Sequence, residues 1–301
     1  MQNFNKRTAV ITGAASGLGL AMARIAAAEG MRVVMADVQA DALDAATAEI
    51  AALGADLLPF RLDVSVAAEV EALAAATRAR FGVPHLLINN AGVGAGGLVW
   101  EMDPADWAWV LGVNLMGVVH GLRAFVPAML EAAAADPGYQ GHIVNTASMA
   151  GLVNVPNLGV YNVGKHAVVS LSETLHHDLA LVTDRVRTSV LCPFYVPTGI
   201  GRSARNRPGG PTAAAPTPSQ QIAQAMLDKA VEAGKLGADE VARLAFDAVR
   251  EQRFYVFSHP QALGAVRERL DGLLQGRNPA DPYAARPELG ERLRRALRPA
   301  G

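Results

Sequence analysis

The sequence TAVITGAASGLG at residues 8–19 decides the fold. Its first four residues are mostly apolar or β-branched, which is typical of a buried strand, and the Ala-rich stretch that follows predicts a helix over Gly17–Glu29. The turn between them holds Gly13, Ser16, Gly17, Leu18 and Gly19. Glycines in such a turn let the backbone approach a pyrophosphate, which the free N–H groups at the start of the helix bind. The stretch therefore predicts a dinucleotide site made by these five residues.

Further along the chain, short β-branched runs alternate with Ala-rich stretches of helical length, which is typical of βαβ units and a parallel sheet. Strands are predicted at Thr8–Ile11, Arg32–Ala36, Leu57–Arg61, His85–Ile88, His142–Asn145, Arg187–Leu191 and Phe254–Phe257. Helices are predicted at Gly17–Glu29, Asp41–Leu53, Ala67–Phe81, Asp106–Ala133, Val160–Val182, Ser219–Glu232, Ala238–Glu251 and Gln261–Leu274. We expect an α/β fold, a Rossmann-type doubly wound parallel sheet of about seven strands, in a single domain over residues 1–301.

Two segments fall outside this alternation. Residues 199–219 are rich in Gly, Pro and small side chains and show no hydrophobic periodicity, so we expect a mobile loop on the substrate side. Residues 275–301 carry several Arg and Pro residues and indicate a C-terminal extension on the surface, with a short helix at Pro287–Leu297.

The composition excludes several classes of partner. Lys plus Arg number 27 and Asp plus Glu number 28, so no overall charge favours nucleic acid or an acidic membrane. The single cysteine, Cys192, excludes an internal disulfide framework and a cysteine-rich zinc site, and we expect no metal. We find neither a signal peptide nor an apolar run of about 18 residues, the length of a membrane span. The expectation is a cytoplasmic protein with a small, nearly neutral ligand.

Asp37 ends the second predicted strand. A carboxylate at this place can accept hydrogen bonds from the ribose hydroxyls of adenosine, whereas a 2′-phosphate would meet a like charge. Neither Ser16 nor Val38 supplies a compensating cation, so the sequence favours NAD over NADP. Two alternatives stay open at this point. Asp37 can serve as a turn residue or helix cap, and a glycine loop followed by an acid also suits an adenosyl-methionine site in a methyltransferase.

Tyr161 and Lys165 are four residues apart, a spacing that on a helix places both side chains on one face. A free tyrosine is a poor base because its pKa is about 10, and a neighbouring cation lowers that pKa. On the spacing alone, a solvated helix face is the commoner explanation. Ser148 adds a second polar group, since it lies just beyond the fifth predicted strand, at the edge where open α/β sheets bind ligands.

Taken together, these residues resemble the short-chain dehydrogenase/reductase family, in its compact NAD(P)-dependent branch. The matching positions follow the family's order and are TGAASGLG at Thr12–Gly19, Asp37, Asp63 and Val64, Asn89 through Gly92, Asn114, Ser148, Tyr161, Lys165, and Pro193 through Thr198. They span about the first two thirds of the chain.

The resemblance implies a role for each catalytic position. Tyr161 would exchange a proton with the oxygen of an alcohol or ketone, and Ser148 would hydrogen-bond the same oxygen. Lys165 would lower the pKa of Tyr161 and bind the nicotinamide ribose. Asn114 would tie a water into a proton relay from Lys165. No Gly-x-Ser-x-Gly elbow surrounds Ser148, so a hydrolase nucleophile is not expected.

The resemblance also implies contacts to the cofactor. Asp63 and Val64 would flank the adenine, and Asn90, Ala91 and Gly92 would lie behind the cofactor. Pro193, Val196 and Thr198 belong to the same site, the last two at the carboxamide. For Asn90 and Asn114, the alternative is a turn or helix cap without cofactor contact.

The chain departs from the family pattern where substrates bind. Phe194 follows Pro193, where the family usually has Gly, so we expect an altered backbone or a narrower space near the nicotinamide. The side chains expected around the cleft are apolar: Met149, Leu152, Val155, Phe194 and Tyr195, with Trp100 as a further candidate for its border.

We therefore expect an NAD-dependent enzyme that interconverts a secondary alcohol and a ketone, with a hydrophobic or aromatic substrate. A non-catalytic NAD/NADH-binding sensor is the alternative, although a sensor needs no proton path. The resemblance further implies a homo-oligomer, a tetramer or dimer, assembled through the helices at Asp106–Ala133 and Val160–Val182.

Overall fold

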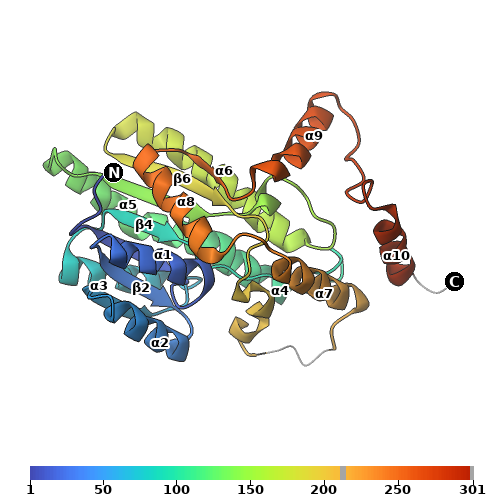
Figure 1. Cartoon of the computed structure of the whole chain (residues 1–301), viewed down its shortest axis with the longest axis horizontal. Helices are drawn as coiled ribbons and strands as arrows, with labels where there is room; N and C mark the ends of the chain where they lie inside the picture. The colour runs from blue at the N-terminus through green and yellow to red at the C-terminus, as the bar shows by residue number, and fades with distance from the viewer. Residues whose placement is uncertain (211–214, 299–301) are drawn as a thin grey trace.

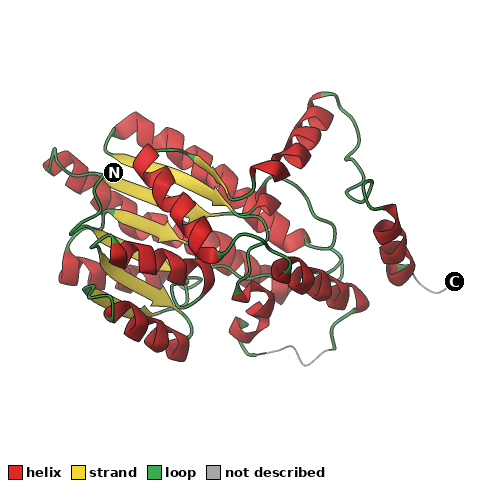
Figure 2. Cartoon of the chain, viewed as in Figure 1, coloured by secondary structure: helices red, strands yellow, loops and turns green. Residues whose placement is uncertain are grey.

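A seven-stranded parallel sheet organises the computed structural model, which describes residues 1–210 and 215–298 (Figures 1 and 2). Its strands are β1 (Thr8–Thr12), β2 (Arg32–Asp37), β3 (Leu57–Arg61), β4 (Leu86–Asn89), β5 (Gly141–Thr146), β6 (Val186–Cys192) and β7 (Tyr255–Phe257). Their order across the sheet is β3-β2-β1-β4-β5-β6-β7. The expected Rossmann-type sheet is confirmed, and each predicted strand end lies within one residue of the observed one.

Helices cover both faces of the sheet. One face carries α1 (Gly17–Ala28), α2 (Ala40–Ala51) and α8 (Ala238–Glu251), and the other carries α3 (Ala67–Phe81), α4 (Pro104–Leu111), α5 (Gly117–Ala135) and α6 (Gly159–Val182). The remaining helices are α7 (Pro218–Glu232), α9 (Leu263–Leu274) and α10 (Pro287–Leu297). These three lie on the side to which the strands point (Figure 1).

The central strands are largely apolar because both faces of the sheet are buried there. On β1, Ala9 and Ile11 pack into the cluster beneath α1 and α8, whereas Val10 packs into the opposite cluster with α3 and α5. All three side chains are fully buried. Such continuous burial is what a parallel sheet requires. Because the strand order reverses between β1 and β4, a crevice opens beyond the carboxyl ends of these two strands.

The helix predicted over Asp106–Ala133 is interrupted. One π-helical turn, Gly112–Met116, joins α4 to α5, so the backbone is helical from Pro104 to Ala135. Asn114 lies within this turn and is buried. Single π turns inside helices are frequent at functional sites. The apolar periodicity of the sequence does not reveal the turn, because the flanking helices keep the same buried face.

This helical run also has the length and hydropathy of a membrane span, with 44% of the apolar window buried. Polar and charged residues, among them Asn114, Arg123 and Glu131, interrupt the stretch, so it is not the continuous apolar run whose absence the sequence indicated. Phe125, Val126 and Met129 on its inner side are buried in the cluster that covers the sheet. Packing against the sheet thus accounts for the apolar inner side of the run.

The segment at residues 199–219 is more ordered than its composition predicted. Gly199–Asn206 forms a 3-10 helix, η3, and α7 begins at Pro218 with Thr217 as its cap. Residues 211–214, on which the middle of the predicted loop falls, lie outside the described part of the chain. The predicted helix at Pro287–Leu297 is confirmed as α10, in an extension that leaves the body of the molecule after α9 (Figure 1).

Acid should destabilise the fold through two histidines. Burial lowers the pKa of His142 to about 3 and that of His85 to about 4, whereas both groups titrate at about 6.5 in an unfolded chain. Between these values the unfolded chain binds more protons, so the free energy of unfolding should fall as the pH drops from about 6.5 to 4. His142 alone should contribute about 3 kcal/mol to that loss.

Urea unfolding at a series of pH values measures this dependence. His142→Gln keeps a polar group opposite the Ser189 hydroxyl, which lies 2.8 Å from Nε2 of His142, and removes the titration. The variant should therefore lose less stability than the parent protein over the same pH range. Equal losses in the two proteins would contradict the assignment.

Candidate active site

The loop between β1 and α1 is shaped by positions that exclude a side chain. Gly13 and Gly17 have φ angles of 66° and 53°, which residues with a Cβ rarely adopt. A Cβ on Gly19 would lie 1.9 Å from the carbonyl oxygen of Gly13, and a Cβ on Gly13 would lie 2.9 Å from Cα of Ala91. Ser16 precedes α1 and makes no cap hydrogen bond. The start of α1 therefore stands open to the crevice, as an anion site requires.

Asp37 is buried at the end of β2, with 8% of its surface exposed. Its Oδ2 accepts a hydrogen bond from the backbone N–H of Ala15 and its Oδ1 accepts one from that of Gln39, both at 3.0 Å. The side chain does not cap α2, whose N-cap is Gln39. The cap alternative is therefore wrong, although Asp37 does hold the turn after β2. The residue also lines the crevice.

Asn90 ties the ends of three strands together. Its backbone N–H and that of Ala91 donate to Oγ1 of Thr12 at 2.9 and 3.1 Å, and its Nδ2 donates to the carbonyl of Thr12 at 3.1 Å. Its Oδ1 accepts from Oγ1 of Thr146 at 3.3 Å. The side chain of Asn90 thus has a structural role, while Asn90, Ala91 and Gly92 all line the crevice.

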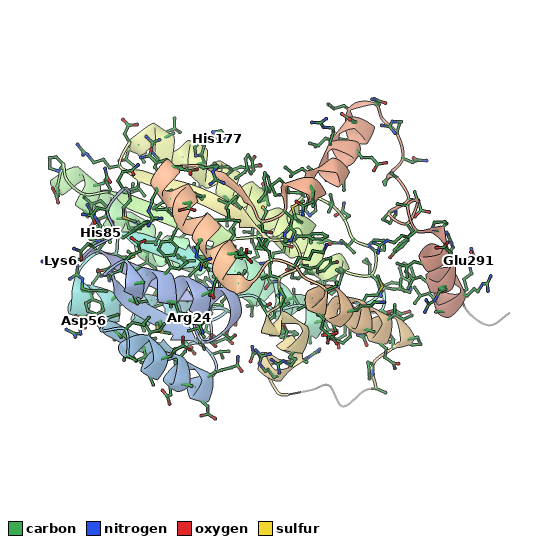
Figure 3. The ribbon with its side chains drawn as sticks, viewed as in Figure 1. Lys6, Arg24, Asp56, His85, His177 and Glu291 are labelled. Atoms are coloured by element: carbon green, nitrogen blue, oxygen red, sulfur yellow. The ribbon has the colours of Figure 1, made fainter. Side chains whose placement is uncertain are left out.

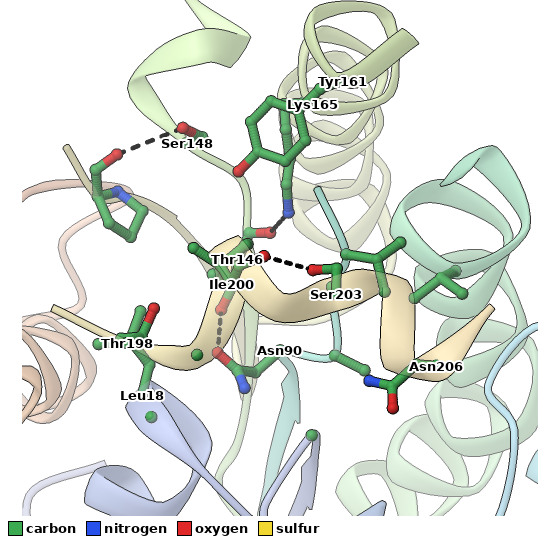
Figure 4. A pocket seen from close by; sticks show the side chains of 18 of the residues that line it. Leu18, Asn90, Thr146, Ser148, Tyr161, Lys165, Thr198, Ile200, Ser203 and Asn206 are labelled. Carbon is green, nitrogen blue, oxygen red and sulfur yellow. Dashed lines mark hydrogen bonds between the residues drawn. The ribbon is translucent and has the colours of Figure 1, made fainter. Parts of the chain in front are cut away.

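Ser148, Tyr161 and Lys165 meet in the crevice beyond the end of β5 (Figure 4). Nζ of Lys165 donates to the carbonyl of Thr146 at 2.9 Å and lies 5.8 Å from the centre of the Tyr161 ring. Oγ of Ser148 accepts from the backbone N–H of Ala150 at 3.1 Å. One turn of α6 therefore carries the phenol and the ammonium toward Ser148, as the spacing predicted.

Burial governs the ionisation of this cluster. It raises the pKa of Tyr161 to about 12, and the hydrogen bond with Ser148 lowers that pKa by a smaller amount. Burial also lowers the pKa of Lys165 to about 8. Burial is thus the largest influence on the pKa of Tyr161 in this structure, because removing a phenolate from water is costly, and the role that the family implies for Lys165 stays a prediction. Tyr161 is a protonated phenol at neutral pH.

Asn114 does not line the crevice but hydrogen-bonds Val93, which does. Its Oδ1 accepts from the backbone N–H of Val93 at 2.8 Å, and its Nδ2 donates to the carbonyl of Val93 at 2.9 Å. A Cβ on Gly164 would lie 3.6 Å from Cβ of Asn114, so the π turn packs against the helix that carries Tyr161 and Lys165. The amide is thus engaged in clamping the segment after β4. The relay role that the family implies for Asn114 stays a prediction.

At the opposite side, Asp63 and Val64 follow β3 and line the crevice. Oδ1 of Asp63 accepts from the backbone N–H and the hydroxyl of Ser65 at 2.8 and 2.7 Å. Val64 is buried, and its carbonyl lies 2.9 Å from Nδ1 of His120. These bonds fix the turn after β3 at the edge of the crevice.

Phe194 lines the crevice and does not distort the backbone. Its φ is not positive, so no strain arises where the family has Gly. Its ring packs edge-on against Tyr195, with ring centres 4.6 Å apart, and lies 5.6 Å from the ring of His259. Its backbone N–H donates to Oγ of Ser258 at 2.9 Å. The aromatic wall at this end of the crevice is therefore made by the side chain of Phe194.

The structure brings most of the predicted site residues into one crevice. Those that line it are Gly13, Ser16, Gly17, Leu18, Asp37, Asp63, Val64, Asn90, Ala91, Gly92, Ser148, Tyr161, Lys165, Pro193, Val196 and Thr198. Gly19 and Asn114 are not among its lining residues and support it from outside. In the described part of the chain, no group of three or more His, Cys, Asp or Glu side chains is placed to hold a metal ion.

The prediction that Trp100 and Leu152 border the cleft is wrong. Trp100 is 80% exposed and does not line the crevice, and Leu152 packs instead with the apolar cluster near β6 and α9. Trp109, which lies on the buried face of α4, lines it in their place. Sequence reasoning also missed the contributions of η3 and α7, which are Ile200, Ser203, Arg205, Asn206, Leu227 and Val231. Only the three-dimensional path of the chain after β6 brings these residues to the crevice.

A parallel sheet with a glycine loop after β1 and a Ser-Tyr-Lys cluster after β5 defines an oxidoreductase of the short-chain dehydrogenase type. The family model described as short chain dehydrogenase matches residues 7–209. The chain belongs to this family.

Solved structures and curated proteins agree with that membership. A short-chain dehydrogenase/reductase from Burkholderia phymatum, solved in complex with NAD, is 50% identical and superposes with a TM-score of 0.90 over 94% of this chain and 99% of its own. A 1-deoxy-11-beta-hydroxypentalenate dehydrogenase from Streptomyces avermitilis is 36% identical over 85% of each chain. The CLA biosynthesis dehydrogenase/reductase of Lactiplantibacillus plantarum is 31% identical over 90% of this chain and 94% of its own.

Gly19→Ala should disrupt the cofactor loop, because the added methyl group would overlap the backbone of Gly13. We expect a loss of about 3 kcal/mol in the free energy of unfolding and no measurable binding of NAD. Gly272→Ala is the matched control, since Gly272 also lies in a helix and has no atom near its Cβ position. That control should be neutral or stabilised by about 0.5–1 kcal/mol. Thermal unfolding and calorimetric titration with NAD measure both effects, and a fully stable Gly19→Ala protein that binds NAD would refute the steric argument.

Proposed function

We propose that this protein is an NAD-dependent dehydrogenase or reductase that interconverts a hydrophobic secondary alcohol and the corresponding ketone. The observation that carries the proposal is one crevice that joins Asp37 and the glycine loop to Ser148, Tyr161 and Lys165. The relative from Burkholderia phymatum, which was solved in complex with NAD, supports the choice of cofactor.

The residues present fit a dinucleotide. The glycine loop leaves open the space that side chains would otherwise fill, and the first turn of α1 offers N–H groups to the pyrophosphate. The carboxylate of Asp37 would accept the ribose hydroxyls of adenosine, Asp63 and Val64 would flank the adenine, and Val196 and Thr198 would hold the carboxamide. The bound nicotinamide would supply or accept the hydride.

The Ser-Tyr-Lys cluster would move the proton. Because burial keeps the pKa of Tyr161 at about 12, its phenol is protonated at neutral pH and can donate to the oxygen of a ketone. The hydroxyl of Ser148 would donate to the same oxygen and orient it. The ammonium of Lys165, held by the carbonyl of Thr146, would stabilise the phenolate that remains.

The lining near this cluster supports a hydrophobic substrate. Its side chains are Met149, Val153, Val155, Leu158, Phe194, Tyr195, Leu227 and Val231, none of which carries a formal charge at neutral pH. Such a lining rewards the burial of apolar surface and offers no charged partner to a carboxylate or phosphate on the substrate. The relative from Streptomyces avermitilis is named for a hydroxypentalenate, and its name supports an alcohol as the reacting group.

Oxidation of a panel of 1-arylalkanols and cyclic alcohols with NAD, and reduction of the matching ketones with NADH, test this function. Tyr161→Phe should lower the rate about 1000-fold, since the proton donor is removed while the ring remains. It should leave NAD binding largely intact. Tyr255→Phe is the matched control, because the Tyr255 hydroxyl bonds to Glu173 outside the crevice.

The result that would overturn catalysis is a wild-type activity no higher than that of Tyr161→Phe while NAD still binds. That outcome would indicate an NAD/NADH sensor. Thermal stabilisation by adenosyl-methionine but not by NAD would instead indicate a methyltransferase.

Asp37→Asn should shift the preference between cofactors. The amide retains an acceptor for the N–H of Ala15 and gives up the one for the N–H of Gln39, and it removes the negative charge, so the penalty on a 2′-phosphate is relieved. We expect the ratio of the NADP and NAD dissociation constants to fall by about tenfold, in line with the loss of one nearby like charge. Calorimetric titrations of both cofactors measure the ratio. Asp41→Asn removes the same charge from the exposed first turn of α2 and should leave the ratio unchanged.

A further inference from the structure

η3 brings an arginine to the cofactor side of the crevice. Nε of Arg205 donates to Oε1 of Gln39 at 2.9 Å, a contact between residues 166 positions apart in the chain. Its Nη1 donates to the carbonyls of Gly199 and Arg202 at 3.1 and 2.7 Å. The guanidinium is therefore held by η3 on one side and by the turn after β2 on the other. Both Arg205 and Gln39 line the crevice.

The neighbours of Arg205 place it between two expected phosphate positions. Gln39 follows Asp37 by two residues and bonds to its carboxylate through the backbone. On the opposite side, a Cβ on Gly199 would lie 3.3 Å from Nη2 of Arg205. The preceding Thr198 lies 3.1 Å from the Cβ position of Gly17, at the start of α1. The guanidinium thus lies between the adenosine ribose side and the pyrophosphate side of the site.

The segment that carries Arg205 is anchored at the opposite rim of the crevice. Oγ of Ser203 accepts from the backbone N–H of Gly94 at 2.9 Å and donates to the carbonyl of Ile200 at 2.6 Å. Arg207 pairs with the carboxylates of Asp106 and Asp103 at the start of α4. These contacts hold η3 over the crevice, so the position of Arg205 is set by the fold. Figure 4 shows η3, with Ile200, Ser203 and Asn206, below Tyr161 and Lys165 in the same crevice.

The charge of Arg205 is available to a ligand. Its hydrogen bonds go to an amide oxygen and two backbone carbonyls, all of them neutral. Among the ion pairs of the described residues, none joins Arg205 to a carboxylate. Neutral acceptors orient a guanidinium without cancelling its charge, and because Nε and Nη1 donate these bonds, Nη2 is the nitrogen left to donate to a phosphate.

We propose that Arg205 is a phosphate-binding residue of the cofactor site, with Gln39 as the residue that positions it. The inference rests on the proposed function, since it assumes a bound dinucleotide. The placement of Arg205 puts two phosphates within its reach. The pyrophosphate is common to both cofactors, and a contact there strengthens NAD and NADP alike. The 2′-phosphate belongs to NADP alone, and a contact there supplies the cation that neither Ser16 nor Val38 provides.

Calorimetric titration of the full chain with NAD, NADP, ADP and adenosine 2′-phosphate tests the proposal. Arg205→Gln should raise the dissociation constants of the ligands whose phosphate contacts Arg205 by about fivefold to tenfold. This is the effect of removing one charge-assisted hydrogen bond near the surface. Arg202→Gln is the matched control, because Arg202 lies on the same helix, is exposed and does not line the crevice. Added salt should weaken ligand binding by the parent protein more than ligand binding by Arg205→Gln, since salt screens the charge that only the parent protein carries.

Both sources of phosphate leave a distinct pattern. Equal weakening of NAD, NADP and ADP assigns Arg205 to the pyrophosphate, whereas weakening of NADP and adenosine 2′-phosphate alone assigns it to the 2′-phosphate. Gln39→Leu should reproduce part of the loss, and the double variant should bind no more weakly than Arg205→Gln itself. If Arg205→Gln binds each of the four ligands as tightly as Arg202→Gln does, the inference is wrong. If the parent protein binds none of them, the proposed function itself fails.

Discussion

A series of polar contacts along the carboxyl edge of the sheet connects the glycine loop after β1 to Lys165. Asn90 hydrogen-bonds Thr12 on one side and Thr146 on the other, and the carbonyl of Thr146 accepts a hydrogen bond from the ammonium of Lys165. These groups come from β1, β4 and β5 and from α6, which are far apart in the chain. Because buried polar groups must find partners, the three strand ends cannot shift independently. The glycine loop and Lys165 therefore keep a fixed separation, as the proposed transfer of a hydride and a proton to one substrate would require.

The same burial that makes the site apolar determines its protonation. Tyr161 and Lys165 both lie where water is scarce, so each favours its neutral form relative to free solution. A protonated phenol beside an ammonium is suited to donating a proton, and the apolar lining around it is suited to a hydrophobic substrate. The protonation state of the cluster and the hydrophobic substrate proposed for it thus share one physical cause, the burial of the crevice. Asp37 and Arg205 line the other end of the crevice, where the proposed dinucleotide would place its adenosine.

The strands and most site residues were predictable because each depends on a local pattern. Strands buried on both faces leave continuous apolar runs, and the residues that end β2 and β5 follow those runs directly. Predictions failed where a position depends on a distant segment. Trp100 and Trp109 are equally apolar in the sequence, and only the packing of α4 decides that Trp109 reaches the crevice. The composition of residues 199–219 predicts an irregular loop, yet hydrogen bonds to Gly94 and Gln39 and an ion pair with Asp106 stabilise η3.

The sequence by itself determined the order of the elements, the glycine loop, Asp37 and the Tyr161–Lys165 pair, because spacing within one strand, turn or helix specifies each of them. Tertiary structure alone decided which way the ionisation of Tyr161 shifts, since desolvation depends on everything packed around the ring. It also decided that Asn114 clamps Val93 from a π turn and that Arg205 reaches Gln39. Contacts of this kind join segments whose separation in the chain carries no periodic signal, so they exist only once the sheet has brought those segments together.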